Sequence, residues 1–344
     1  MSTESGFRLP LAARIFLASA LMVAVAVALA AFVTLKQGGR AGAEAVDHSL
    51  DAADAAQARL EQLSFEKLDI IAKTITNDAD FVRYLATATD DGLGLGEVQL
   101  APSDTEPVAV PDTAGTPADA AAVVETASPP AKFDQASIKD LLDQQRETYE
   151  FAFGMVLDAD GRVVGRTDER EAFQEDFASD PMFGTMIADI SGVTGYWRDG
   201  VNLYQVSAQP MAMDQDLVGF LVVGAMIDAG IVKQVREVSN GQVAYWMLDR
   251  EDLRLVATSV DEADAKLLRE SISKIEAQVK AQLAKGEALS RVDLALGERK
   301  FAARLAPLFG QPGDAIGGVL TMTSIDAAME PFRSIQNAVL LGGL

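Results

Sequence analysis

The chain has no cysteine and only one histidine. The absence of thiols excludes a disulfide framework, a thiolate nucleophile and a cysteine-based zinc site. His48 lies just beyond the first apolar segment, where we expect an exposed helix residue rather than a catalytic base. A hydrolase would have to rely on paired carboxylates, and no pair stands out from the general acidic surface. We therefore predict no enzyme, no cofactor and no metal site in these residues.

Basic residues are also scarce, with 29 Lys and Arg against 51 Asp and Glu and a net charge of −22. Nucleic acids and anionic headgroups are bound through excess positive charge, so a nucleic-acid partner is not expected. The remaining composition, 49% hydrophobic over 344 residues, is enough for a large core and about two domains.

Residues 15–34 carry no charge and are long enough to cross a bilayer as a helix. We expect a transmembrane anchor, with a cleaved signal peptide as the alternative. Residues 1–14, which include Arg8 and Arg14, would form a cytoplasmic tail, although Lys36 and Arg40 nearly match this charge on the other side. The acidic bulk would then lie outside the membrane, in a bacterial periplasm or extracellular space.

The C-terminal segment 328–344 is expected to be an exit helix that runs into the start of a second membrane helix. Its last residues are apolar but too few to span a bilayer, so the chain is expected to be cut off there. A frayed apolar tail is the alternative.

Apolar residues at helical spacing predict one long helix over residues 44–86, whose stripe faces either the following domains or a partner helix. Residues 90–132 are rich in Pro, Ala, Thr and Asp and are expected to form a flexible insertion.

The rest of the chain contains two copies of one pattern. "LDADGRVVGRT" aligns with "LDREDLRLVAT", which pairs Asp158 with Asp249 and Arg166 with Ala257. "LYQVSAQPM" aligns with "KFAARLAPL", and "VGFLVVGAMIDAG" with "IGGVLTMTSIDAA", which pairs Tyr204 with Phe301 and Asp228 with Asp326. Each copy predicts a strand pair, a helical stretch and three further strands.

The strand pair of the first copy turns at "DADG". An EF-hand calcium loop counted from Asp158 fails, because its fifth and sixth positions are Arg162 and Val163. We predict instead a tight hairpin turn in which Asp160 and Gly161 supply two positive φ angles. Helical stretches are predicted over residues 168–190 and 267–283.

The predicted fold class is α+β, with two modules that each hold a five-stranded antiparallel sheet and helices on one face. In their order and doubling, these phrases resemble the double Cache sensors, the tandem PAS-like extracytoplasmic domains of bacterial transmembrane receptors. The resemblance implies a membrane-distal module over 134–230, a membrane-proximal module over 243–327, a homodimer, and ligand binding in the distal module.

The resemblance also suggests where the ligand site lies. One amino-acid-binding subfamily uses an arginine and aromatics on the middle strands and an aspartate after the last one; its Arg-x-Trp order is absent here. The candidate ligand-binding residues in this chain are Arg166, Trp197, Arg198, Tyr204 and Asp228. Guanidinium groups suit a carboxylate or an amino acid, which they bind through paired hydrogen bonds. For Tyr204 and Asp228, a core aromatic and a structural cap are the competing interpretations.

The function expected is ligand sensing outside the cytoplasm and signal transmission across the membrane. The alternative is a membrane-anchored adaptor whose repeated modules bind another protein. The ligand and the cytoplasmic output, whether cyclase, histidine kinase, diguanylate cyclase or chemotaxis module, are open at this point.

Overall fold

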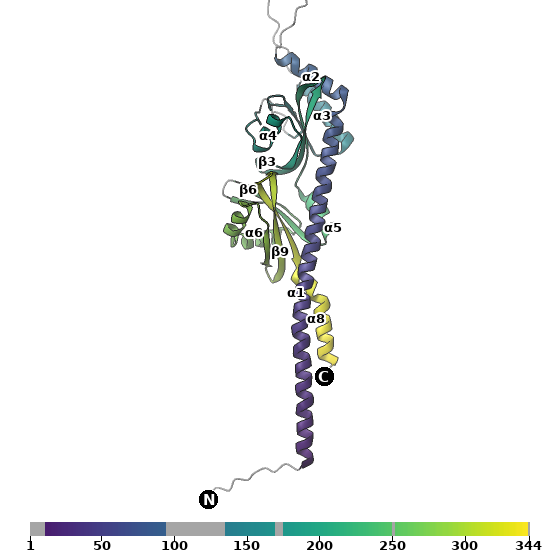
Figure 1. The fold of residues 1–344 in the computed structure, drawn as a ribbon, viewed down its shortest axis with the longest axis vertical. Coiled ribbons are helices and arrows are strands. Elements are labelled where there is room, and N and C mark those ends of the chain that lie inside the picture. Colours follow the sequence, from purple (N-terminus) through teal and green to yellow (C-terminus); the bar gives the residue numbers. More distant parts are fainter. Residues whose placement is uncertain (1–10, 94–134, 169–174, 250–251, 343–344) are drawn as a thin grey trace, which may run out of the picture. The chain divides into compact units, whose positions relative to one another are not determined.

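A computed structural model describes residues 11–93, 135–168, 175–249 and 252–342 (Figure 1). Most of the predicted insertion over 90–132 lies outside the described residues, and so do the side chains of nearly all of the predicted anchor over 15–34. Within the part that is described, no helix has the length and hydropathy needed to cross a membrane.

The chain divides into two compact units. Unit 1 comprises Met1–Lys67, Gly195–Val206 and Ala225–Leu344, and unit 2 comprises Leu68–Thr194 and Ser207–Gly224.

Two five-stranded antiparallel sheets confirm the predicted α+β class and the doubled strand order. The first sheet has the order β2-β1-β5-β4-β3 and the second the order β7-β6-β10-β9-β8. The first is built from β1 (Phe153–Asp158), β2 (Val163–Arg166), β3 (Val193–Asp199), β4 (Asn202–Met213) and β5 (Asp216–Met226). The second is built from β6 (Gln242–Asp249), β7 (Asp252–Thr258), β8 (Leu289–Leu296), β9 (Arg299–Gln311) and β10 (Asp314–Ser324).

The prediction of helices on only one face of each sheet is wrong. Every residue of β1 and β2 is buried, so both faces of this strand pair need cover. In unit 2, α3 (Gln135–Tyr149) packs on one face, where Ile138 and Leu142 join a core with Val156, and α4 (Pro181–Asp189) lies on the other side (Figure 1).

The second sheet is covered on both faces as well, within unit 1. One face packs against α6 (Glu262–Ser273) and α7 (Glu276–Leu283), and the other against α5 (Ala229–Ser239) and the long helix α1 (Leu11–Thr76). The helix predicted over 267–283 is thus two helices that meet at residues 274–275. In the first module, α4 is the only helix in the described part of the stretch predicted over 168–190.

The helix predicted over 44–86 is also two helices, α1 (Leu11–Thr76) and α2 (Ala79–Leu93). The Asp78 carboxylate accepts hydrogen bonds from the backbone N–H groups of Asp80 and Phe81 at 3.0 and 3.4 Å. This is helix N-cap geometry, so Asp78 begins a new helix where the apolar stripe alone predicted continuity. At the other end of the chain, α8 (Ile325–Gly342) begins three residues before the predicted exit segment.

The turn between β1 and β2 is longer than the predicted two-residue turn. Gly161 has a φ of +87°, whereas Asp160 is not among the residues with positive φ. The Asp158 carboxylate instead accepts bonds from the N–H groups of Asp160 and Arg162, at 2.9 and 2.8 Å. Asp158 therefore organises this loop, and the described residues contain no group of side chains suited to a metal ion.

Candidate functional site

Arg166, the last residue of β2, is only 2% exposed. Its Nε donates to Asp168 Oδ1 at 3.0 Å and its Nη2 to Asp168 Oδ2 at 2.9 Å. A carboxylate oxygen of Glu175 lies 3.7 Å from Nη1, and the guanidinium carbon lies 5.4 Å from the centre of the Phe153 ring. Unit 2 therefore contains a buried cation that holds a carboxylate by two parallel hydrogen bonds.

The strand register places Arg166 on the same face of the sheet as Phe153. Arg166 lies opposite Met155. The next residue, Thr167, makes two hydrogen bonds with Gly154: the Thr167 N–H donates to the Gly154 carbonyl, and the Gly154 N–H donates to the Thr167 hydroxyl. Because side chains alternate along a strand, Phe153, Met155 and Arg166 face one way. The opposite face, at Gly165, is the one that meets Ile138 and Leu142 of α3.

The second sheet has no arginine at the corresponding position. In the β1–β2 ladder, Arg166 pairs with Met155, and the register shifts after the next residue of β1. In the β6–β7 ladder, Thr258 pairs with Ala244, and the register likewise shifts after the next residue of β6. Thr258, not Ala257, is thus the structural counterpart of Arg166, so the sequence alignment was wrong by one residue here. The face with Ala244 packs into a hydrophobic cluster with α6 and α7.

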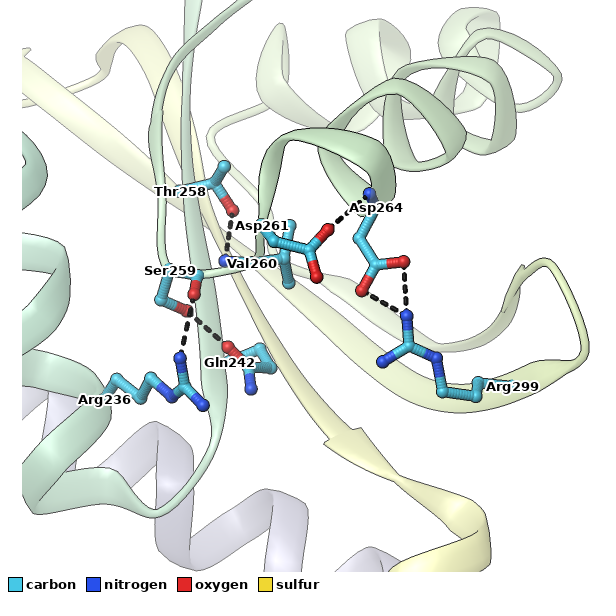
Figure 2. Close-up of polar contacts among 8 residues, drawn as sticks. All are labelled: Arg236, Gln242, Thr258, Ser259, Val260, Asp261, Asp264 and Arg299. Atoms are coloured by element: carbon cyan, nitrogen blue, oxygen red, sulfur yellow. Dashed lines mark hydrogen bonds and ion pairs between the residues drawn. The ribbon is translucent and has the colours of Figure 1, made fainter.

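Polar groups at and after the end of β7 form hydrogen bonds with backbone groups (Figure 2). Ser259 Oγ accepts from the Val243 N–H at 2.8 Å and donates to Gln242, and the Ser259 carbonyl accepts from Arg236 at 3.2 Å. Asp261 accepts a bond from the Asp264 N–H at the start of α6.

Figure 2 also shows the Asp264 carboxylate bonded to Arg299. Here the carboxylate is the buried partner and the arginine side chain is 57% exposed, which is the reverse of the arrangement at Arg166. Among the described residues of the second module, no buried cation lies in this region.

Trp197 of β3 and Tyr204 of β4 form an aromatic pair in unit 1. Both are buried, and their ring centres lie 5.5 Å apart. The β3–β4 hairpin and the β8–β9 hairpin both have two-residue turns. The correspondence of Tyr204 with Phe301 therefore extends across the turn and pairs Trp197 with Leu294. Leu294 lies opposite Phe301 in the second sheet. The sequence comparison found no counterpart for Trp197, although the equal lengths of the two turns identify Leu294 as the counterpart.

Arg198 and Asp228, also in unit 1, bond the backbone. Arg198 Nη1 donates to the Leu248 carbonyl at 2.6 Å and lies 4.0 Å from an Asp249 oxygen. Asp228 is exposed and is the N-cap of α5, accepting bonds from the N–H groups of Gly230 and Ile231. The structure thus brings together Trp197 with Tyr204, and Arg166 with partners that the sequence did not indicate.

Those partners are Phe153, Asp168 and Glu175 in unit 2. The first two were accessible to sequence reasoning: Asp168 stands two positions after Arg166, and Phe153 begins the neighbouring strand. Glu175 follows residues outside the described part, and no pattern placed it near the guanidinium.

No protein-family model matches the chain, and no curated protein matches it. Similar solved structures include the sensor domain of the histidine kinase DctB from Vibrio cholerae, at 13% identity over 81% of this chain and 96% of that one, with a TM-score of 0.45. A domain of a putative sensory box/GGDEF family protein from Vibrio parahaemolyticus is 10% identical over 84% and 99%, with a TM-score of 0.46. The ligand-binding domain of the Campylobacter jejuni chemoreceptor Tlp3, in complex with 4-methylisoleucine, is 9% identical over 83% and 93%, with a TM-score of 0.40. All three are described as parts of bacterial sensory proteins or receptors.

Proposed function

We propose that this chain is the extracytoplasmic sensing region of a bacterial membrane receptor and that unit 2 binds a small carboxylate-bearing molecule at Arg166. The observation that carries the proposal is the buried Arg166 guanidinium, which the second module replaces with Thr258 in apolar surroundings. The ion pair of the second module, Asp264 with Arg299, has an exposed arginine, so among the described residues the buried arginine is a feature of the first module. We infer that this difference reflects ligand binding in unit 2.

The contacts of Arg166 are those that a ligand carboxylate would use. Removing a guanidinium from water is costly unless it is paired, and Asp168 supplies the partner in the unliganded chain. Asp168 itself is 26% exposed, so one side of the ion pair reaches solvent. An entering carboxylate would take the place of Asp168 and keep two parallel bonds to Arg166.

Local charge matters more than the overall field in this chain. A net charge of −22 repels anions at long range, so an anionic or zwitterionic ligand requires a buried cation at short range. Burial of Arg166 provides this, because its bonds are shielded from competing water. Trp197, Tyr204, Arg198 and Asp228 all belong to unit 1, so they are not part of the site proposed at Arg166 in unit 2.

The test is a thermal-shift screen of the purified chain with amino acids and dicarboxylates, followed by calorimetric titration of any hit. A ligand at about 100 times its Kd stabilises the folded state by about 2.7 kcal/mol, which is several degrees in Tm. Arg166→Met should weaken binding by about 1.5–3 kcal/mol, and Arg166→Lys should recover only part of it, because lysine lacks the planar fork.

Arg162→Gln is the matched control, since Arg162 lies in the same hairpin but its side chain is 46% exposed. Its affinity should equal that of the unchanged chain. A hit that binds Arg166→Met as tightly would refute the site, and a screen with no hit would favour the adaptor.

We further propose that residues 15–34 anchor the receptor in the inner membrane and that the receptor is a homodimer. Membrane fractionation before and after deletion of residues 15–34, and light scattering of the detergent-solubilised chain, test these two points. A soluble parent chain, or a monomer at micromolar concentration, would contradict them.

A further inference from the structure

Polar side chains from the long helix and from both sheets meet inside unit 1. They are Gln57, Glu61 and Ser64 of α1, Tyr196 of β3, Gln205 of β4 and Tyr245 of β6. Four of them, the two glutamines and the two tyrosines, are at most 4% exposed. Glu61 is the only carboxyl group in the set.

Hydrogen bonds join these side chains into one chain. Gln57 Nε2 donates to Glu61 Oε2 at 2.8 Å, and the Tyr196 hydroxyl also bonds the Glu61 carboxyl group. Gln205 Nε2 donates to the Tyr196 oxygen at 3.1 Å, and Ser64 Oγ donates to Gln205 Oε1 at 2.6 Å. The Glu61 carboxyl group is thus linked through Tyr196 and Gln205 back to α1.

Apolar groups surround this chain of bonds. The Phe65 ring packs edge-on against Tyr196 at 5.3 Å, and α5 contributes Val232 and Val235 to the same cluster. The titratable groups that face Glu61 are Tyr196 from the first sheet and Tyr245 from the second, and both are neutral phenols at ordinary pH.

Among the described residues, no lysine, arginine or histidine forms an ion pair with Glu61. Burial therefore raises the pKa of Glu61 above its usual value of 4.5, and the bonds from Gln57 and Tyr196 offset only part of this. Burial also raises the pKa of Tyr245, to about 12, and that of Tyr196.

We propose that Glu61 is a proton-binding site through which this chain senses pH, independently of any small-molecule ligand. In the ionised state the Glu61 carboxylate accepts from Gln57 Nε2 and from the Tyr196 hydroxyl. In the proposed protonated state the proton taken up from solvent resides on the oxygen that accepts from Tyr196, so this oxygen becomes a donor and the bond with Tyr196 reverses. Tyr196 then needs another acceptor for its own hydrogen, so the bonds to Gln205 and Ser64 rearrange as well.

The rearrangement alters how α1 is held, because Glu61 bonds α1 to the first sheet and Gln57 bonds it to the second. For a carboxyl group whose pKa is raised on folding, the folded state binds the proton more tightly than the unfolded state. Stability from this group is fully present below the usual glutamate pKa of 4.5 and is lost as the pH rises through the raised value. Acidification thus stabilises the protonated arrangement.

A local readout is required, because burial raises the pKa of Asp54 on the same helix too. The full-length chain, labelled with ¹³C at the glutamate side-chain carboxyl carbons, would be titrated by NMR, and the Glu61 signal assigned by its loss in Glu61→Gln. We expect a midpoint above 4.5 for Glu61. Tyr196→Phe should raise this midpoint further, because the carboxylate loses a donor.

Amide hydrogen exchange across α1 and β3 would be followed over the same pH range. We expect a pH-dependent change, beyond the intrinsic exchange rate, that disappears in Glu61→Gln and persists in Glu66→Gln, an exposed glutamate on the same helix. A midpoint at or below 4.5, or protection that changes equally in both variants, would overturn the proposal. If Glu61→Gln does not fold, the Glu61 signal is assigned by its displacement in Tyr196→Phe, and its titration in the unchanged chain still decides the proposal.

Discussion

Gly219 lies against the backbone of Leu157, so close that a Cβ atom at Gly219 would be 2.2 Å from the Leu157 carbonyl oxygen. The second module repeats this relationship, since a Cβ at Gly317 would be 2.2 Å from the Trp246 carbonyl oxygen. In both sheets the glycine begins the long pairing of the last strand with the first. The close approach of the first and last strands in each module thus requires a glycine at this position.

Gly219→Ala and Gly317→Ala should each lower the free energy of unfolding by roughly 1–3 kcal/mol, because the obstacle is a backbone atom that cannot turn aside. Urea denaturation measures the loss. Gly165→Ala is the control, since its Cβ would meet the Ile138 side chain at 3.3 Å, which can move. An equal loss in all three variants would show that the carbonyl contact is not the cause.

The same two glycines explain how much of the fold the sequence could predict. They were aligned correctly, because β5 and β10 are long apolar strands with similar phrases around them. The first strands were aligned two residues out of register: Gly219 faces Asp158, whereas Gly317 faces Met247 rather than Asp249. Strands that are buried on both faces show no alternation of polar and apolar residues, so their register could be determined only from the hydrogen-bonded pairing in the structure.

The site was predictable to a smaller extent. Comparing the two copies correctly singled out Arg166 as unmatched, but its contacts depend on a short loop geometry that no spacing specifies. Asp228 was found by its place after the last strand, and the competing interpretation as a structural cap agrees with its bonds to α5. Arg198 lies beside a hairpin turn, and its side chain donates a hydrogen bond to the carbonyl of Leu248. Because Leu248 is far away in the sequence, no local pattern could predict this contact.

Asp228→Ala should cost about 0.5–2 kcal/mol of stability, because the first N–H groups of α5 lose their acceptor. The affinity for any ligand of unit 2 should stay unchanged. Asp180→Ala, which removes the N-cap of α4, provides a matched comparison of similar size. Weaker ligand binding in Asp228→Ala at unchanged stability would restore Asp228 to the ligand site.

Asp168→Asn should destabilise the unliganded chain by up to about 3 kcal/mol, because the buried guanidinium of Arg166 loses its doubly bonded carboxylate and keeps Glu175 at 3.7 Å. A carboxylate ligand would supply the missing charge, so it should raise the Tm of the variant more than that of the unchanged chain. Thermal unfolding with and without ligand measures both effects. Equal ligand-induced shifts in the two proteins would show that ligand and Asp168 do not compete for Arg166.

Arg304→Gln should reveal the effect of Asp54, the second carboxyl group of α1 whose pKa is raised by burial. Arg304 Nη1 lies 2.9 Å from Asp51 Oδ1 and 2.6 Å from Asp54 Oδ2. Burial raises the pKa of Asp54 from its usual 3.8, while bonds from Thr321 and Arg304 lower it. Without Arg304 the pKa of Asp54 rises further.

For such a group, stability is fully present below the usual value of 3.8 and is lost as the pH rises through the folded-state pKa. The variant should therefore lose more stability at about pH 7 than at about pH 4, where much of the carboxyl group is already protonated. The difference should be about 1–2 kcal/mol in urea denaturation, since the pair is partly exposed. Arg83→Gln, which removes an exposed ion pair with Asp80, should change stability by less than about 0.5 kcal/mol at either pH. An equal loss for Arg304→Gln at both pH values would mean that its contribution is packing of the side chain rather than charge.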